Sequence, residues 1–192
     1  MDVYIFYLRD PKLKGEAIHA EETKVLEGEN IVLRPPRESD VEAAYVWDKD
    51  PELAAWNGRA PLSISLSAAR RDYLSRWDDR SVKTFIIEVD EEPVGMATLY
   101  DFRKGGCELG IKIGPHDLRG HGIASEAVEL LLEYTFEELR VGLVRGSTLS
   151  HNHRMQRVFE KHGFREVGDG SILSRYDNRR YSELFYEKRR GD

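Results

Sequence analysis

Residues 118–127 read LRGHGIASEA, and the order of residues in this stretch predicts a phosphate-binding loop. Two glycines, Gly120 and Gly122, stand beside Arg119 where a segment with helical spacing begins. The first amides of a helix have no intrahelical partner and can donate to an anion. Glycine lets the backbone approach that anion, because no side chain intervenes. A plain turn that leads into a helix would give the same letters.

The expected anion contacts are mostly with the backbone. A hydrogen bond to a charged group contributes about 1.5–3 kcal/mol, whereas a helix dipole adds about 0.3–1 kcal/mol. The Arg119 cation is expected to be a lesser contribution. The P-loop pattern G-x-x-x-x-G-K-[ST] is absent, and a dinucleotide fingerprint would need glycine at Ser125. A nucleotide-binding module is therefore only a rival interpretation.

Composition indicates one globular domain with an acidic balance. The chain has 192 residues, of which 40% are hydrophobic and 33% charged, and its formal net charge is −6. This charge argues against a nucleic-acid partner and is compatible with a cationic small molecule or peptide end. The single cysteine, Cys107, excludes a disulfide within the chain and predicts a reducing cytoplasm. No segment reaches the roughly 20 apolar residues of a membrane span, so no membrane partner is expected.

Hydrophobic periodicity predicts an α+β, or mixed α/β, domain. Ser39 and Glu42 have the spacing of a capping box, and Gly163 is expected to end the last helix. Strands are expected at residues 3–8, 31–33, 84–89, 94–100, 107–113, 141–149, near 171–176 and at 180–187, with 84–113 forming an antiparallel meander. Helices are expected at 39–47, from Pro51 to 56, at 65–79, from the quoted stretch to about Leu139 and at 152–162. Residues 1–29 form an expected extension of strand and linker, before a domain at 30–192.

Several segments together resemble one family. RGHGIA (119–124) matches the R/Q-x-x-G-x-G/A signature of the GNAT superfamily of acetyl-CoA-dependent N-acyltransferases. The segments ELGIKIGP (108–115) and NHRMQRVFEKHGF (152–164) flank it in the family's order. IVLRPPRESDVEAAYVW (31–47) looks like the opening strand and helix. The closing RYDNRRYSELFYEKRR (175–190) is similar to the ribosomal-protein-alanine-acetyltransferase-like branch, and the resemblance covers roughly residues 30–190.

The resemblance implies a twisted mixed sheet that splays in the middle and holds acetyl-CoA as cosubstrate. It implies transfer of the acetyl group to a primary amine, on a small molecule or a peptide N-terminus, by direct attack in a ternary complex. A non-catalytic acyl-CoA-binding regulatory domain is the alternative, and a homodimer is compatible with either. The implied cofactor-binding residues are Ile111, Lys112 and Ile113 (backbone), Arg119, Gly120, His121, Gly122, Ile123, Ala124 and Ser125 (amides), and Asn152 and Phe159.

Acetyl transfer to an amine needs a base and a donor to the developing oxyanion. We expect the backbone N–H of Ile111 to be this donor. Glu108 is the expected general base, although a solvent-facing strand glutamate would fit the same pattern, and Glu88 is a weaker rival. Phe159 occupies the place of the family's tyrosine acid, so its ring is expected beside the cofactor or, alternatively, in the core. Met155 stands where the related branch often has serine.

Tryptophans and histidines give weaker signals. The family's acceptor pocket is usually covered by the region that contains Trp47, Trp56 and Trp77, although core packing is their ordinary role. The histidines at 121, 151 and 153 are interpreted as solvated loop residues, and no metal site is expected.

Overall fold

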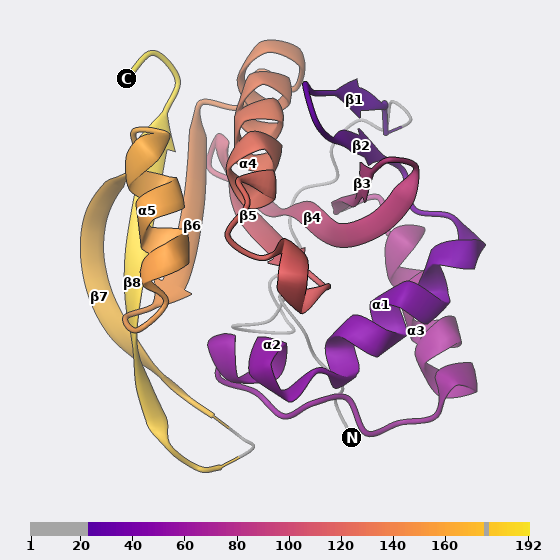
Figure 1. Ribbon diagram of the computed structural model, residues 1–192. Helices are drawn as coiled ribbons and strands as arrows, with labels where there is room; N and C mark the ends of the chain where they lie inside the picture. Colours follow the sequence, from indigo (N-terminus) through magenta and orange to yellow (C-terminus); the bar gives the residue numbers. More distant parts are fainter. Residues whose placement is uncertain (1–22, 175–176) are drawn as a thin grey trace.

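The computed structural model describes residues 23–174 and 177–192 (Figure 1). The strand expected at 3–8 lies outside the described residues. The described strands form one eight-stranded sheet in the order β1-β2-β3-β4-β5-β6-β8-β7, which confirms the predicted mixed α/β class. The strands are β1 (Leu26–Glu27), β2 (Val32–Arg34), β3 (Lys83–Val89), β4 (Glu92–Arg103), β5 (Gly106–Ile113), β6 (Leu143–Leu149), β7 (Arg165–Leu173) and β8 (Arg180–Arg189).

The central meander has the predicted antiparallel pairing. On one side β4 pairs with β3, from Lys83↔Leu99 to Val89↔Glu92. On the other side β4 pairs with β5, and Ala97↔Ile111 lies in the middle of this ladder. The continuous run of buried residues in β3, 83–87, matches a sheet that is covered on both faces.

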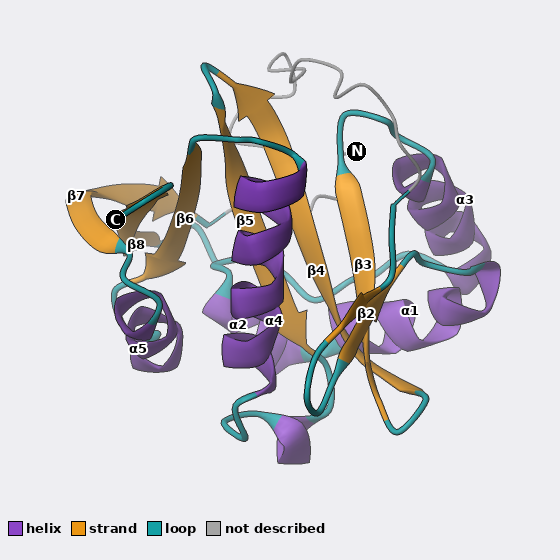
Figure 2. Cartoon of the chain, turned by 90° about the horizontal axis from the view of Figure 1, so that it is seen from above, coloured by secondary structure: helices purple, strands orange, loops and turns teal. Residues whose placement is uncertain are grey.

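Helices cover both faces of the sheet (Figure 2). On one face, α4 and α5 pack with Phe85, Leu99 and Val144 in the larger core. On the other face, α1 and α3 form a second core around Ala44, Trp47 and Tyr73. The α-helices are α1 (Val41–Lys49), α2 (Pro51–Trp56), α3 (Leu66–Trp77), α4 (Ile123–Glu133) and α5 (His153–Lys161).

The predicted capping box at Ser39 is wrong. A 3-10 turn, Glu38–Asp40, precedes α1, and Asp40 is the N-cap residue of α1. The Asp40 carboxylate instead accepts from the Arg37 amide at 2.6 Å and from Arg34 Nη1 at 2.7 Å. The buried guanidinium of Arg34 thus holds the carboxylate of Asp40, the residue that directly precedes α1.

Other boundaries differ from the sequence expectation by a few residues. After Glu133 the helix continues as a π-helical turn, Tyr134–Glu138. The expected strand near 171–176 starts earlier, because β7 begins at Arg165. Leu26 and Glu27, within the expected linker, pair with Leu33 and Val32 as strand β1.

Candidate functional site

The sheet opens between β5 and β6. These parallel strands pair only over Gly106↔Leu143, Cys107↔Val144 and Glu108↔Arg145. Beyond Glu108, β5 continues to Ile113 with β4 on one side only. The β6-facing edge of residues 109–113 therefore offers backbone groups that no strand occupies, and we call this edge the splay edge.

Strand alternation decides which backbone groups face the splay edge. The Gly114 amide donates to Val94 O of β4 at 2.8 Å. Because backbone groups of successive residues point to opposite sides of a strand, those of Gly110 and Lys112 also face β4. Those of Leu109, Ile111 and Ile113 face the splay edge. The N–H of Ile111 is thus directed toward the splay edge.

The loop before α4 has the geometry of an anion site. Gly120 and Gly122 have φ of 92° and 91°, and a Cβ built on either would meet nothing within 4 Å. The first intrahelical hydrogen bond of α4 runs from the Glu126 amide to Gly122 O at 3.0 Å. The amides of Ile123, Ala124 and Ser125 therefore precede the helical ladder and remain available to a ligand.

The guanidinium of Arg119 is engaged by protein groups. Its Nη1 lies 2.7 Å from Glu52 Oε2, and its Nη2 contacts Asp50 and the Gly114 carbonyl. Nε donates to Ile113 O at 3.1 Å. With two carboxylates beside it and only 9% of the side chain exposed, this cation is largely neutralised locally. The main role of Arg119 is therefore to order the loop. It contributes little positive charge to the binding of an anion.

Two groups that the sequence analysis missed lie at the first turn of α4. Lys161 Nζ and His162 Nε2, from the end of α5, each lie 2.9 Å from Ser125 Oγ. Ser125 itself is buried. Burial, followed by the nearby charge of Lys161, lowers the pKa of His162. No local pattern links these residues to Ser125, because only the packing of α5 on α4 brings them there.

The comparisons with known proteins show the family. The acetyltransferase (GNAT) domain family matches residues 30–165. The chain belongs to the GNAT acetyltransferase family. This family uses acetyl-CoA, and the chain is accordingly an acetyl-CoA-dependent N-acyltransferase.

Relatives and solved structures support the same family and fold. An uncharacterized N-acetyltransferase, p20, of Bacillus licheniformis is 24% identical over 73% of this chain and 82% of its own. The spermidine N(1)-acetyltransferase of Escherichia coli K12 is 22% identical over 73% and 75%. A Vibrio cholerae spermidine N-acetyltransferase, solved with CoA and spermine, has a TM-score of 0.76 at 17% identity, covering 84% of this chain and 96% of its own.

The observed groups fit acetyl-CoA as a ligand of this GNAT domain. The amides at the start of α4, with the open space beside Gly120 and Gly122, suit a pyrophosphate. The free edge of β5 suits the amide groups of a pantetheine arm. Asn152 is the N-cap of α5, and its Oδ1 accepts from the Met155 amide at 3.2 Å. Its Nδ2 group would then remain available as a donor to the arm.

Two expected cofactor contacts need correction. The Lys112 backbone faces β4, and its buried side chain points to α1, where Nζ lies 2.7 Å from Asp48. Phe159 is 1% exposed and stacks on Tyr186 at 4.8 Å between ring centroids. A Cβ built on Gly146 would lie 2.5 Å from Cζ of Phe159. The ring therefore ends against β6, as a core residue does, and not in an open cofactor channel.

The two candidate bases lie in different places. Glu108 is half-buried at the point where β5 and β6 part, in register with Tyr100 and Arg145. It shares a strand face with Lys112, the face covered by α1. Glu88, by contrast, is ion-paired with Arg34 on β2 and lies on β3, two strands from β5. This geometry leaves Glu108 as the carboxylate nearer the splay.

The three tryptophans do not share one environment. Trp47 is buried in the second core, and Trp77 stacks on Tyr73 at 5.6 Å. Trp56 is partly exposed at the end of α2, with the Arg154 guanidinium 5.7 Å from its ring. Trp47 is therefore enclosed by protein, whereas Trp56 and Trp77 keep some exposed surface. The histidines at 121, 151 and 153 are exposed.

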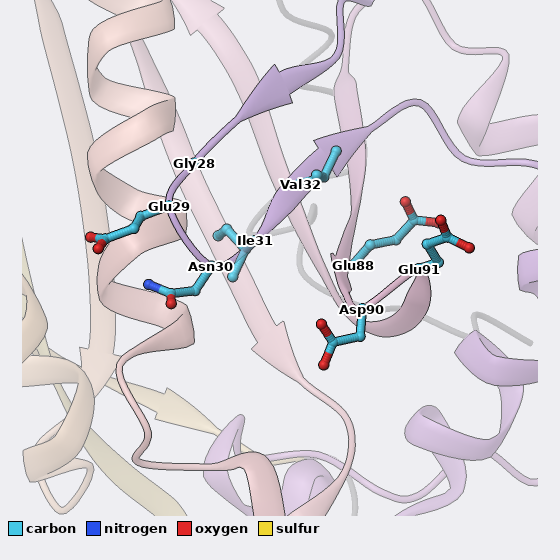
Figure 3. A pocket seen from close by; sticks show the side chains of 8 residues that line it. All are labelled: Gly28, Glu29, Asn30, Ile31, Val32, Glu88, Asp90 and Glu91. Atoms are coloured by element: carbon cyan, nitrogen blue, oxygen red, sulfur yellow. The ribbon is translucent and has the colours of Figure 1, made fainter.

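A separate pocket of about 270 Å³ lies at the β2–β3 end of the sheet (Figure 3). Carboxylates of Glu88, Asp90 and Glu91 surround it, beside Asn30 and Val32. None of its lining residues belongs to β5 or to the loop before α4, so this pocket is separate from the splay edge and from that loop. Within residues 23–174 and 177–192, no helix is suited to span a bilayer, and no cluster of potential metal ligands is found.

Proposed function

We propose that this GNAT enzyme acetylates the primary amine of a small cationic acceptor, by direct attack while acetyl-CoA and acceptor are both bound. One observation carries the proposal. β5 and β6 part after Glu108, which leaves the backbone edge of β5 at Ile111 unpaired on the β6 side, and Arg119 ties the end of β5 to the loop that precedes the uncommitted amides of α4.

Each group has a defined task in this proposal. Acetyl-CoA, when bound, supplies an activated acetyl thioester. The N–H of Ile111 donates to the acetyl oxygen, where negative charge develops during transfer. Glu108 lies three residues before Ile111, about 10 Å along an extended strand. It would therefore take the proton of the acceptor ammonium through a water molecule.

Cys107 favours direct attack over an acetylated cysteine. It is the single cysteine of the chain and is fully buried. Burial is the main reason that the pKa of its thiol is raised to about 12. A buried neutral thiol is a poor nucleophile, so Cys107 cannot act as an acetyl carrier.

Charge on the face opposite α4 and α5 supports a cationic acceptor. Glu183 and Glu187 of β8 are in register with Leu149 and Arg145 of β6. Leu149 lies near Gly58 at the end of α2, so these side chains share the α2 face of the sheet with Glu108. The same face carries the guanidiniums of Arg145 and Arg189, and Arg189 pairs with Glu187. The remaining acidic excess, together with the formal net charge of −6, favours a cation over an acidic peptide. Relatives named for spermidine agree with this direction.

An acceptor screen tests the proposal. Thiol release from acetyl-CoA would be followed with spermidine, an aminoglycoside, a basic peptide and an acidic peptide at equal concentration. We expect release with a cationic acceptor and a loss of about 10²–10⁴-fold in kcat for Glu108→Gln. Glu92→Gln, at the exposed start of β4, is the matched control. Thiol release with none of the acceptors, or a preference for the acidic peptide, would contradict the acceptor assignment.

We also infer a cytoplasmic enzyme, in line with the single free thiol. The peptide N-terminus as acceptor and the homodimer remain predictions. The basic-peptide arm of the screen addresses the first, and sedimentation equilibrium addresses the second.

A further inference from the structure

The corner between α1 and α2 contacts the end of β5 and the loop that follows it, the two parts to which the proposal assigns acetyl-CoA. A Cβ built on Gly114 would lie 2.1 Å from the indole of Trp47. The next residue, Asp48, binds Lys112 of β5. Asp50 and Glu52, at the start of α2, both bind Arg119. Helices on the acceptor side of the sheet therefore hold the strand end and the loop on the cofactor side.

Arg119 links Asp50 and Glu52 to the end of β5 at the splay edge. Its Nε donates to the Ile113 carbonyl at 3.1 Å, and its Nη2 contacts the Gly114 carbonyl. The same side chain thus fixes the end of β5 and the start of the loop that carries Gly120 and Gly122. Removing its carboxylate partners would release both segments together.

We infer that Asp50 is a positioning residue for acetyl-CoA, acting through Arg119 from the acceptor side of the sheet. This inference rests on the proposed placement of acetyl-CoA at the splay edge and the loop. It predicts that removing the Asp50 charge changes the acetyl-CoA affinity in the direction opposite to the one that simple electrostatics gives. If Arg119 served mainly as a cation for the pyrophosphate, removing the neighbouring carboxylate would strengthen binding. If Asp50 positions the loop, the same change weakens binding.

Asp50→Asn separates these effects with little other disturbance. Asp50 is also the N-cap of α2, and its Oδ1 accepts from the Glu52 amide at 2.8 Å and the Leu53 amide at 3.4 Å. Asparagine is an equally good N-cap residue, so the variant keeps the cap and removes the charge. Glu42→Gln is the matched control, because it removes one charge from the exposed first turn of α1.

Calorimetry would measure the acetyl-CoA Kd, and steady-state kinetics would separate KM from kcat. For Asp50→Asn we expect Kd and the acetyl-CoA KM to rise about tenfold, a coupling typical of one salt-bridge network. We expect kcat to stay nearly constant. A double-mutant cycle with Arg119→Gln should be non-additive, and Glu42→Gln should leave Kd unchanged.

The outcomes distinguish this inference from the proposed function. Failure of the wild-type protein to bind acetyl-CoA would overturn the proposed site. Wild-type binding together with an unchanged or tighter Kd in Asp50→Asn would overturn only the positioning role. If Asp50→Asn does not fold, Glu52→Gln is used instead, because that side chain is 41% exposed and also binds Arg119. An unchanged Kd in folded Glu52→Gln would then count against the inference.

Discussion

Lys112 Nζ lies 2.7 Å from Asp48 Oδ1, and the two side chains are only 3% and 2% exposed. Arg59 Nη2 lies 3.3 Å from the same oxygen, and the Tyr73 hydroxyl donates to the other. Burial by itself raises the pKa of Asp48, but the charges of Lys112 and Arg59 outweigh it and the net pKa is lowered. One carboxylate therefore joins α1, α3 and β5 inside the molecule.

Asp48→Asn should cost much of the stability of the domain. The variant leaves two cations, on Lys112 and Arg59, without their carboxylate in a buried site. Breaking a buried pair in this way typically costs about 3–5 kcal/mol. Urea unfolding would measure the change in the free energy of unfolding.

Asp72→Asn is the matched control for this measurement. Asp72 pairs with Arg76 one turn along α3, and its side chain is 33% exposed. Pairs of this kind contribute about 0.3–0.5 kcal/mol. Similar losses of unfolding free energy in Asp48→Asn and Asp72→Asn would contradict a large contribution of the buried cluster to stability.

Gly122→Ala should weaken acetyl-CoA binding more than it weakens the fold. The residue has φ of 91°, so any side chain is strained there, although the space beside it is open. A side chain in that space would stand between the α4 amides and a phosphate. We expect the Kd for acetyl-CoA to rise at least about tenfold, or about 1.4 kcal/mol, by calorimetry. Gly122→Asp should lose more, because it adds a repelling charge.

Gly105→Ala provides the control for backbone strain. Gly105 has φ of 70° in the turn between β4 and β5, again with open space around it. Gly105→Ala should lose about as much stability as Gly122→Ala does, and it should keep the acetyl-CoA affinity of the wild-type protein. Equal affinities in Gly105→Ala and Gly122→Ala would remove the phosphate-site assignment.

Local patterns predicted the elements of this fold well. Short strand-like runs separated by the turn sequences DEEP (90–93) and RKGG (103–106) located β3, β4 and β5. The glycines before α4 indicated the loop, because positive φ and close approach both favour glycine. These signals depend only on neighbours in the chain.

The site was less predictable where partners are distant in sequence. The backbone direction of Lys112 depends on the register with β4, and its side-chain partner Asp48 is 64 residues away. The pairing of Asp40 with Arg34 depends on burial, because Arg34 is buried where β2 joins the sheet. Neither ion pair can be predicted from a local sequence pattern, because each depends on the strand pairing and the burial of the folded chain.

The stability of the fold should fall as the pH decreases through the titration of His162. The pKa of this imidazole is lowered in the folded protein, by burial first and by Lys161 second. The unfolded chain takes up its proton near pH 6.5, before the folded chain does. The contribution of His162 is therefore complete above about pH 6.5 and is lost as the pH falls through the folded-state pKa.

Urea unfolding at about pH 7.5 and about pH 5.5 would measure this dependence. His162→Gln should lose less stability between these conditions than the wild-type protein does. The exposed residue His153 gives the control, and His153→Gln should keep the wild-type dependence. If His162→Gln leaves the loss of stability between the two pH values unaltered, this loss comes from other groups.

Phe159→Tyr should destabilise the enzyme without raising its turnover. The ring is held between Phe164 and Tyr186, with centroid distances of 4.9 and 4.8 Å. Its Cζ faces the main chain of Gly146, where even an added Cβ would lie at 2.5 Å. A hydroxyl on Cζ would have to displace β6 or remain buried without a partner. We expect a loss of about 1–3 kcal/mol in the free energy of unfolding.

Kinetics decide whether the position has any catalytic part. A tyrosine acid that reached the departing sulfur would raise kcat, since general acid catalysis contributes about 10²–10⁴-fold. Gly146→Ala tests the packing independently, because it crowds the same contact from β6 and should also lose stability. A raised kcat in Phe159→Tyr with wild-type stability would show that Cζ faces the cofactor, contrary to the packing described above. Lower stability in both variants with no gain in kcat would leave Phe159 as a core residue and would show that position 159 supplies no acid to the departing thiolate.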